Sequence, residues 1–410
     1  MSYHFPSDFL WGTATAAHQV EGNNTNSDFW VAEHLPATIF AEPSGDAIDH
    51  YHRYLTDIAQ LAELGFNSYR FSIEWARVEP EEGYFSAAAI NHYRRMLEAC
   101  HANNLRPVVT FHHFTSPRWL IAQGGWTNPA TAEKFARYCG HVTEKLGEFM
   151  EVACTINEAN IPRMVGLLWT AKEDQEKQAA FYQAAAATFG VTPDNFAPFM
   201  FASSEQGRDV ILDAHRQAAA AIKAARPELP VGMTLALSDM QAVPGGEAAR
   251  DQFRHELQDV FLAATRNDDF LGVQTYSRER YGPEGPLPPE EGIELTQMGY
   301  EFWPQAVEAT LRYAAQQAGV PLIVTENGIG TADDTRRVAY YRRAIAGVVN
   351  CLQDGLDVRG YYAWSAYDNF EWMLGYRPTF GIIAVDRATQ ERSVKSSARW
   401  LGELAQTNEF

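Results

Sequence analysis

The sequence Pro321-Leu322-Ile323-Val324-Thr325-Glu326-Asn327-Gly328 has the pattern of a buried strand that ends at a charged residue. Leu322 to Thr325 are apolar or β-branched throughout, which is typical of a strand covered on both faces of a parallel sheet. Glu326 follows directly, and Asn327-Gly328 is a pair that favours a loop. A carboxylate at the end of a buried strand is costly to desolvate unless it has a partner or a task. From this segment alone, a strand-end glutamate with its head group in water and a functional carboxylate are equally good interpretations.

Seven further apolar segments alternate with segments of helical periodicity. These candidate strands are residues 9–14, 68–73, 107–111, 152–156, 231–237, 270–276 and 358–364. The clearest helical patterns cover residues 49–64 and 130–146, where apolar positions recur at intervals of three and four. Eight strands that alternate with helices predict an α/β fold, a closed (β/α)8 or TIM barrel. An open doubly wound sheet is the alternative, but no Gly-x-Gly-x-x-Gly turn follows the first strand.

The domain organisation is expected to be simple. The chain of 410 residues has no internal repeat, low-complexity tract or linker, so residues 1–410 are predicted to form a single barrel domain. Two connections are too long for plain strand-to-helix turns. Residues 159–205, which include Trp169 and the pair Phe181-Tyr182, are expected to carry an extra helix over the barrel mouth, and residues 277–299 are rich in Gly, Pro and Glu. Such long loops at the C-terminal face of a barrel usually make the substrate contacts.

Composition excludes several classes of partner. The net charge is -19 at pH 7 and there is no basic run, which argues against nucleic acid and mildly favours a neutral substrate. No apolar run is long enough to cross a membrane. The first residues lack the charged and apolar regions of a signal peptide. The four cysteines (Cys100, Cys139, Cys154 and Cys351) form no metal-ligand spacing, so a cytoplasmic protein with reduced thiols is expected.

Two predicted strands run directly into a glutamate. Residues 152–156 are followed by Asn157-Glu158, and residues 322–325 are followed by Glu326. Because the carboxyl ends of barrel strands meet at one mouth, we expect these two carboxylates to face each other. Two opposed carboxylates are the minimum equipment for glycoside hydrolysis. A structural salt bridge is an alternative for either glutamate alone, but the pair favours catalysis.

Five groups of short motifs follow one another along the chain. They are Phe9-Leu10-Trp11-Gly12-Thr13-Ala14-Thr15 with Gln19-Val20-Glu21-Gly22, Tyr69-Arg70-Phe71-Ser72-Ile73, Thr155-Ile156-Asn157-Glu158, Thr325-Glu326-Asn327-Gly328, and Trp364-Ser365-Ala366-Tyr367-Asp368-Asn369-Phe370-Glu371-Trp372. With these motifs the chain resembles glycoside hydrolase family 1, the β-glucosidase and β-galactosidase family, from residue 9 almost to residue 400. The resemblance implies a retaining exo-β-glycosidase that acts without cofactor on a neutral glucoside, galactoside or fucoside.

The resemblance also implies roles for residues near the two glutamates. Glu326 would be the nucleophile that forms a covalent glycosyl-enzyme, and Glu158 would be the acid and then the base. Arg70 and Tyr276 match the family positions that hold the nucleophile by charge and hydrogen bond, which keeps it ionised. Asn157 matches the residue that contacts the sugar 2-hydroxyl.

The sugar pocket implied by the resemblance consists of polar and aromatic side chains. Its members are Gln19, His113, Asn157, Glu371 and Trp372, with Trp364 as the platform beneath the ring. Without the resemblance, core packing would be an equally good interpretation of the two tryptophans. His112 precedes His113, and adjacent residues on a strand point to opposite faces, so we predict no metal site there. A cis peptide bond between Trp364 and Ser365 is also implied.

The chain departs from the family pattern at four positions near the expected site. Ala159 stands in place of a Pro, Phe114 in place of a Trp, Gln274 in place of an Asn, and Tyr300 in place of a Trp. These departures leave open the preferred sugar and the shape of the outer subsite. Glu371 stands where the branch that hydrolyses phosphorylated sugars has a Ser, and its charge would repel a phosphate.

Two other functions remain open at this stage. A transglycosidase would use the same two carboxylates to pass the sugar to an acceptor other than water. A catalytically silent carbohydrate-binding relative is the alternative outside enzymes, but such proteins typically lose one carboxylate. A small-molecule glycoside is the only partner that the sequence predicts, and the aglycone and the oligomeric state stay undetermined.

Overall fold

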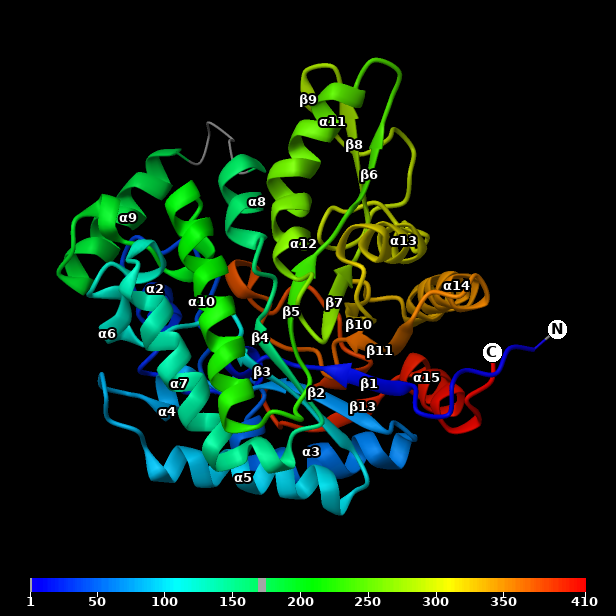
Figure 1. Ribbon diagram of the computed structural model, residues 1–410, viewed down its shortest axis with the longest axis horizontal. Coiled ribbons are helices and arrows are strands. Elements are labelled where there is room, and N and C mark those ends of the chain that lie inside the picture. Colours follow the sequence, from blue (N-terminus) through cyan, green and yellow to red (C-terminus); the bar gives the residue numbers. More distant parts are fainter. Residues whose placement is uncertain (1, 169–174) are drawn as a thin grey trace.

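The protein is a closed barrel of eight parallel strands, as predicted (Figure 1). The computed structural model describes residues 2–168 and 175–410. Around the barrel the strands follow the order β1-β11-β10-β7-β5-β4-β3-β2. Their bounds are β1 Leu10–Ala14, β2 Ser68–Ser72, β3 Arg106–His112, β4 Val152–Ile156, β5 Val231–Ala236, β7 Phe270–Thr275, β10 Leu322–Asn327 and β11 Val358–Trp364.

Helices follow each strand and surround the barrel (Figure 1). The long ones are α3 His50–Leu64, α5 Ala87–Ala102, α7 Ala130–Leu146, α10 Glu205–Ala225, α13 Ala306–Ala318, α14 Asp334–Gln353 and α15 Ser396–Thr407. After β5 the chain forms α11 (Glu247–Arg254) and α12 (Val260–Ala264), joined by a π-helical turn at His255–Asp259. The buried residues of α7 include Phe135, Cys139 and Val142, whose spacing of three and four places them on one face.

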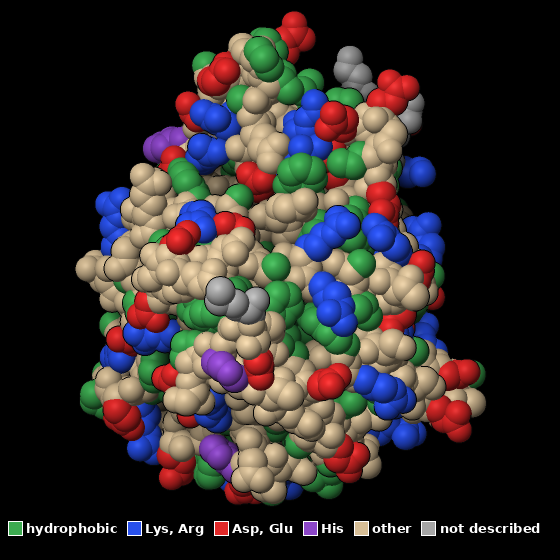
Figure 2. All heavy atoms as spheres, turned by 90° about the vertical axis from the view of Figure 1, so that its right-hand side faces the viewer, with side chains coloured by type: hydrophobic (Ala, Val, Ile, Leu, Met, Phe, Trp, Pro, Cys, Tyr) green, Lys and Arg blue, Asp and Glu red, His purple; other side chains and the backbone are tan. Residues whose placement is uncertain are grey.

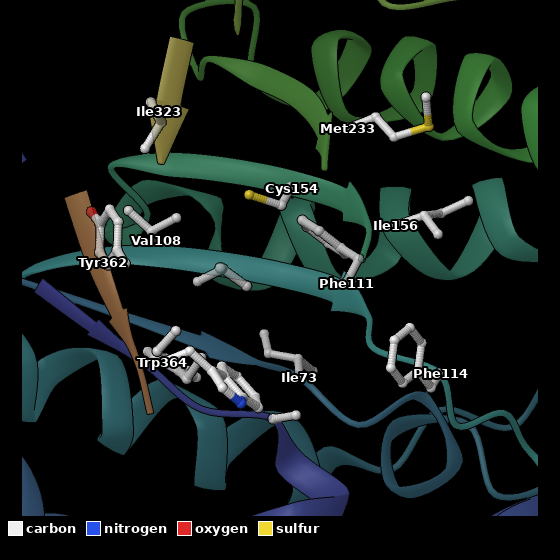
Figure 3. Packing of buried hydrophobic residues seen from close by; sticks show 14 of the residues in the cluster. Ile73, Val108, Phe111, Phe114, Cys154, Ile156, Met233, Ile323, Tyr362 and Trp364 are labelled. Atoms are coloured by element: carbon white, nitrogen blue, oxygen red, sulfur yellow. The ribbon is translucent and has the colours of Figure 1, made fainter. Parts of the chain in front are cut away.

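The barrel strands are covered on both sides, which explains their continuous apolar runs. Every residue of β2, β4, β5, β7 and β10 is buried. Figure 3 shows how side chains such as Val108, Phe111 and Ile156 from neighbouring strands pack together in this region. Arg70 of β2 is a charged residue in this interior and is fully buried, so its charge requires a partner.

Strand β10 is longer than the sequence predicted. The strand was expected to end at Thr325 and the loop to begin at Asn327, but Glu326 and Asn327 pair with Gln274 and Thr275 of β7 after a shift in register. The Asn327 side chain donates a hydrogen bond to the Thr275 carbonyl oxygen at 2.5 Å, which continues the contact between the two strands. The predicted strand end at Thr325 was therefore two residues short, because a tertiary contact extends the strand.

Additional elements cover the mouth of the barrel. The described part of residues 159–205 contains the helices α8 (Ile161–Leu168) and α9 (Gln175–Phe189), followed by the short 3-10 helices Pro193–Asn195 and Phe199–Phe201. Phe181 and Tyr182 of α9 pack edge-on against Phe196. Trp169 lies outside the described residues.

A small sheet extends beyond the barrel strands at the top of Figure 1. It consists of β6 (Asp239–Ala242), β8 (Arg278–Gly282) and β9 (Gly285–Pro286), with β8 in the middle. β6 follows β5, and β8 follows β7, so the sheet is a continuation of two neighbouring barrel strands. It brings residues of the long 277–299 connection over one side of the mouth.

The remaining elements are short. They are α1 Ala17–Val20, α2 Asp28–Glu33, α4 Trp75–Val78, α6 Arg118–Ile121, the 3-10 helices Gly125–Thr127, Gly147–Phe149 and Trp372–Leu374, and the antiparallel pair β12 Ile383–Val385 and β13 Arg392–Val394. The chain ends lie together, with backbone hydrogen bonds between Tyr3 and Phe410 of 2.7 and 2.9 Å.

The surface carries charges of both signs. On the face shown in Figure 2, acidic and basic side chains are interspersed rather than gathered into one basic region. All four cysteines are buried and free. Within the described parts of the chain, no helix combines the length and the apolar character needed to cross a membrane.

Candidate active site

A cavity of about 750 Å³ lies at the carboxyl ends of the barrel strands. Eight of the ten residues that the sequence placed in the site line it, namely His113, Asn157, Glu158, Tyr276, Glu326, Trp364, Glu371 and Trp372. The other two, Arg70 and Gln19, are fully buried behind the wall. The fold therefore brings together side chains from almost the whole length of the chain.

Glu326 is held by two donors, one on each carboxylate oxygen. Arg70 Nη1 donates to Oε1 at 2.6 Å, and the Tyr276 hydroxyl donates to Oε2 at 2.6 Å. Arg70 is placed by β2, and Tyr276 directly follows β7. An ion pair this deep is stable only when its geometry is good and its remaining hydrogen bonds are satisfied. The arrangement orients both oxygens of Glu326 and favours its charged form.

Hydrogen bonds to neighbouring side chains orient Asn157. Its side-chain oxygen accepts hydrogen bonds from Arg70 Nη2 at 2.5 Å and from Gln274 Nε2 at 2.8 Å. Its side-chain nitrogen lies 3.0 Å from His113 Nε2. These contacts set the direction of the amide group. Gln274, which replaces an Asn of the family pattern, thus belongs to the site as a support for Asn157, a role that the sequence analysis did not assign.

Glu158 sits in an unusual backbone conformation. Its φ angle is +44°, in the left-handed region that a non-glycine residue rarely adopts. The Thr234 hydroxyl accepts a hydrogen bond from the Glu158 amide at 3.1 Å, and the Thr234 carbonyl accepts one from Ala159 at 3.1 Å. Backbone strain of this kind costs about 1–3 kcal/mol and clusters at functional sites. Here it turns the chain sharply after β4, with the Glu158 side chain lining the cavity.

The surroundings of the two glutamates favour different protonation states. Burial raises the pKa of Glu158 well above its usual range, the charge of Glu326 raises it further, and Arg70 opposes the rise. Burial also raises the pKa of Glu326, but Arg70 and the Tyr276 hydroxyl oppose that rise by charge and hydrogen bonding. Because Arg70 pairs directly with Glu326, the negative charge is more stable on Glu326 and the proton is more stable on Glu158.

Two tryptophans and a histidine form the aromatic end of the cavity. The rings of His113 and Trp364 lie nearly parallel, with centroids 5.7 Å apart, and those of His113 and Trp372 are 6.0 Å apart. Both tryptophans are buried apart from their contact with the cavity. The peptide bond between Trp364 and Ser365 is cis, as the resemblance implied.

Glu371 and Gln19 add polar groups at this end. Burial, with the charge of Glu326 as a second cause, raises the pKa of Glu371 to about 8. Gln19 Nε2 donates to the Phe370 carbonyl oxygen at 2.7 Å, next to Glu371 in the chain, while its Oε1 is buried with no partner among the described residues. An unpartnered buried acceptor is typical of a ligand site.

The chain was compared with known proteins. The model of glycosyl hydrolase family 1 matches residues 1–265 and 275–410. The chain belongs to glycosyl hydrolase family 1. It is therefore a glycosyl hydrolase, and the predicted family and barrel fold are confirmed.

Relatives of this family 1 hydrolase match over nearly their whole length. Beta-glucosidase A from Acetivibrio thermocellus is 28% identical, and the match covers 99% of both sequences. Thermostable beta-glucosidase B from Thermobispora bispora is 30% identical, and the match covers 98% of this chain and 91% of the relative. The crystal structure of beta-glycosidase BGL167 is 58% identical, with a TM-score of 0.95, and covers 98% of this chain and 97% of its own. A Thermotoga maritima beta-glucosidase in complex with deoxynojirimycin is 26% identical, with a TM-score of 0.87 and 99% of each chain covered.

The paired histidines of the family 1 hydrolase lie in different environments. His113 lines the cavity, whereas His112 packs behind it, with its ring 4.6 Å from Trp126 and 4.8 Å from Phe199. His112 Nε2 is hydrogen-bonded to Ser116 Oγ at 3.0 Å. Among the residues that the structure describes, no group of three or more His, Cys, Asp or Glu side chains is placed to hold a metal ion.

Sequence reasoning missed most of the outer wall of the cavity. This wall includes Ile161, Met164, Val165, Met200, Leu237, Ser238, Glu279 and Met298. These residues come from α8, a 3-10 helix, the two positions that follow β5, strand β8 of the extra sheet, and the loop after β9. The sequence placed substrate contacts in the connections 159–205 and 277–299, which hold six of these eight residues, but it could not name the residues, because their positions depend on how the long loops fold over the mouth.

Proposed function

We propose that the protein is a retaining exo-β-glycosidase that hydrolyses neutral β-glucosides, with β-galactosides and β-fucosides as further substrates. The observation that carries this proposal is the asymmetric pair of carboxyls: Glu326 accepts hydrogen bonds from Arg70 and Tyr276, whereas burial and the charge of Glu326 raise the pKa of Glu158. A nucleophile and a proton donor on one cavity are what double displacement requires. The names of the relatives, beta-glucosidase in both sequence matches, support glucosides as the first substrates to test.

In the first step, a Glu326 oxygen attacks the anomeric carbon and the bond to the leaving oxygen breaks. Glu158 transfers its proton to that oxygen, so the aglycone leaves as a neutral alcohol or phenol. The sugar is now bound to Glu326 as an ester. Asn157, oriented by Arg70 and Gln274, is placed to hydrogen-bond the sugar 2-hydroxyl, a contact that strengthens as positive charge develops on the ring.

In the second step, Glu158 acts as the base. Esterification removes the charge of Glu326, and with it one of the causes that raise the pKa of Glu158. Glu158 then accepts a proton from water, the water oxygen attacks the anomeric carbon, and the ester bond to Glu326 breaks. Two inversions return the sugar with its original β configuration.

The cavity supports a catalytic function over a silent carbohydrate-binding one. A silent carbohydrate-binding relative would need neither the Arg70–Glu326 ion pair nor a proton donor opposite it, whereas here the ion pair is formed and burial raises the pKa of Glu158. A transglycosidase shares the first step and differs only in the acceptor of the second. The dominant acceptor is therefore a matter of product analysis, and water is our proposal.

The test is a panel of nitrophenyl β- and α-glycosides followed by proton NMR. We expect turnover of the β-glucoside, with weaker turnover of the β-galactoside and β-fucoside and none of the α-glucoside. The first sugar product should be the β anomer, which then mutarotates. An α anomer as first product would exclude the double displacement, and a second glycoside as main product would favour transfer over hydrolysis.

The pH dependence of kcat/KM should be bell-shaped. On the acid side the rate rises as Glu326 loses its proton, because only the carboxylate is a nucleophile. On the alkaline side the rate falls as the pH passes through the raised pKa of Glu158, because the proton donor is lost. In the variant Glu158→Gln, assayed with a dinitrophenyl glucoside, the alkaline limb should disappear and the acid limb should remain. An alkaline limb that persists would assign it to another group.

A further inference from the structure

The outer half of the cavity differs in chemistry from the sugar-binding end. Its wall is largely apolar and includes three methionines, Met164, Met200 and Met298, together with Val165 and Leu237. Methionine side chains are flexible and make favourable contacts between sulfur and aromatic rings. The Tyr300 ring borders the same region and is 44% exposed, so it is accessible to a ligand.

One carboxylate, Glu279, interrupts this apolar wall. It lies on β8 of the extra sheet and lines the cavity. Its Oε1 accepts a hydrogen bond from the Ser238 hydroxyl at 3.1 Å, and its Oε2 accepts one from the Tyr281 hydroxyl at 2.5 Å. A carboxylate offers about four acceptor positions, so these two donors leave others free.

The two arginines next to Glu279 in the chain form ion pairs with other glutamates. Arg278 pairs with Glu301 and with Glu290, and Arg280 lies 3.5 Å from Glu290. Within residues 2–168 and 175–410, no ion pair involves Glu279. Burial raises its pKa, and only the two hydroxyl donors oppose this rise. Glu279 is half-buried, and a carboxylate that is partly shielded from water without a cation is costly to keep, which is typical of a position that a ligand completes.

We infer that the outer half of the cavity binds an aromatic aglycone that carries a hydroxyl group, and that Glu279 accepts the hydrogen bond from this hydroxyl. This inference rests on the proposed function, because it names the leaving group of the same reaction. The methionines and Tyr300 contact the aromatic ring. Glu279 is then a specificity-determining residue, since an acceptor that the bound aglycone shields from water discriminates strongly against a ligand that lacks the matching donor.

A second sugar is a poorer fit to this half of the cavity than a phenolic ring. A sugar presents several hydroxyl groups that all need partners. Of the two serines that line this region, Ser277 already donates to the Glu301 carbonyl oxygen at 2.7 Å, and Ser238 donates to Glu279. Desolvating the other hydroxyls of a sugar against methionine and leucine side chains would be unfavourable.

The test compares two substrates that differ in one donor, para-hydroxyphenyl and para-methoxyphenyl β-glucoside. Both leaving groups carry an electron-donating para oxygen, but only the first can donate a hydrogen bond. We expect the wild-type kcat/KM to favour the hydroxyphenyl substrate by about tenfold or more, as for a hydrogen bond to a charged group. In Glu279→Gln this ratio should fall to about twofold, because the remaining acceptor is neutral.

The matched control is Glu284→Gln, an exposed glutamate in the turn between β8 and β9, which should keep the wild-type ratio. Thermal melting checks that both variants are folded. If Glu279→Gln does not fold, the wild-type enzyme still tests the inference. A wild-type kcat/KM that is nearly equal for the hydroxyphenyl and methoxyphenyl substrates overturns it. A β-linked glucose disaccharide that is a better substrate than the hydroxyphenyl glucoside also overturns it, in favour of a sugar aglycone. Failure to hydrolyse any β-glucoside would instead overturn the proposed function.

Discussion

Replacing Glu326 with glutamine is expected to abolish glycosyl-enzyme formation for every leaving group. The amide is a poor nucleophile, and it cannot form the ion pair that Arg70 makes with the carboxylate at 2.6 Å. We expect kcat/KM to fall by about 10⁴-fold or more, as when a covalent catalyst loses its nucleophile. The loss should be equally severe for dinitrophenyl and poorly activated glucosides, because the missing group is needed whatever the leaving group. Steady-state rates, together with mass spectrometry of the denatured enzyme, measure both expectations.

Folding must be checked for Glu326→Gln, because the change leaves the buried Arg70 charge without its partner. Removing one member of a buried ion pair costs about 3–5 kcal/mol of stability. Thermal melting and the control Glu151→Gln, an exposed glutamate just before β4, separate unfolding from loss of chemistry. A folded Glu326→Gln enzyme that azide restores with a β-glycosyl product would show that the nucleophile is another residue.

Replacing Glu158 with glutamine is expected to produce a different failure. The nucleophile remains, so a dinitrophenyl glucoside, which needs little protonation, should still form the glycosyl-enzyme. Poor leaving groups should lose about 10²–10⁴-fold in kcat/KM, the usual contribution of a general acid. The second step lacks its base, so the covalent intermediate should accumulate after a burst of dinitrophenol. Stopped-flow release of the phenol and intact-protein mass spectrometry follow these two events.

Azide gives the sharpest check on the role of Glu158. As a small anion, azide does not need a base, so it should attack the glycosyl-enzyme of Glu158→Gln, restore turnover and give the β-glycosyl azide. The same control, Glu151→Gln, should neither accumulate an intermediate nor respond to azide. Equal loss of activity for good and poor leaving groups in Glu158→Gln would remove Glu158 from the acid and base role.

The barrel itself could be predicted from the sequence because its strands are buried on both faces. A parallel strand that is covered inside and outside reads as a continuous apolar run, and all eight runs correspond to barrel strands. The same reasoning found Glu158 and Glu326, since each glutamate lies within two residues of the end of such a run. The carboxyl ends of all strands of a parallel barrel lie at the same end of the barrel, so the two glutamates had to be near each other. The end of β10 was misjudged because Asn327 continues the contact with β7 through its side chain.

Only the tertiary structure decided how the site is completed. Arg70 reaches Glu326 across 256 positions of sequence and Asn157 across 87, and Gln274 reaches Asn157 across 117. Glu279 enters the cavity through a sheet that forms beyond the barrel. A continuous apolar run shows that a strand is buried, because burial on both faces leaves a local pattern in the sequence. It does not report which buried polar groups meet, because hydrogen bonds form between segments that the closed barrel brings together from distant parts of the chain.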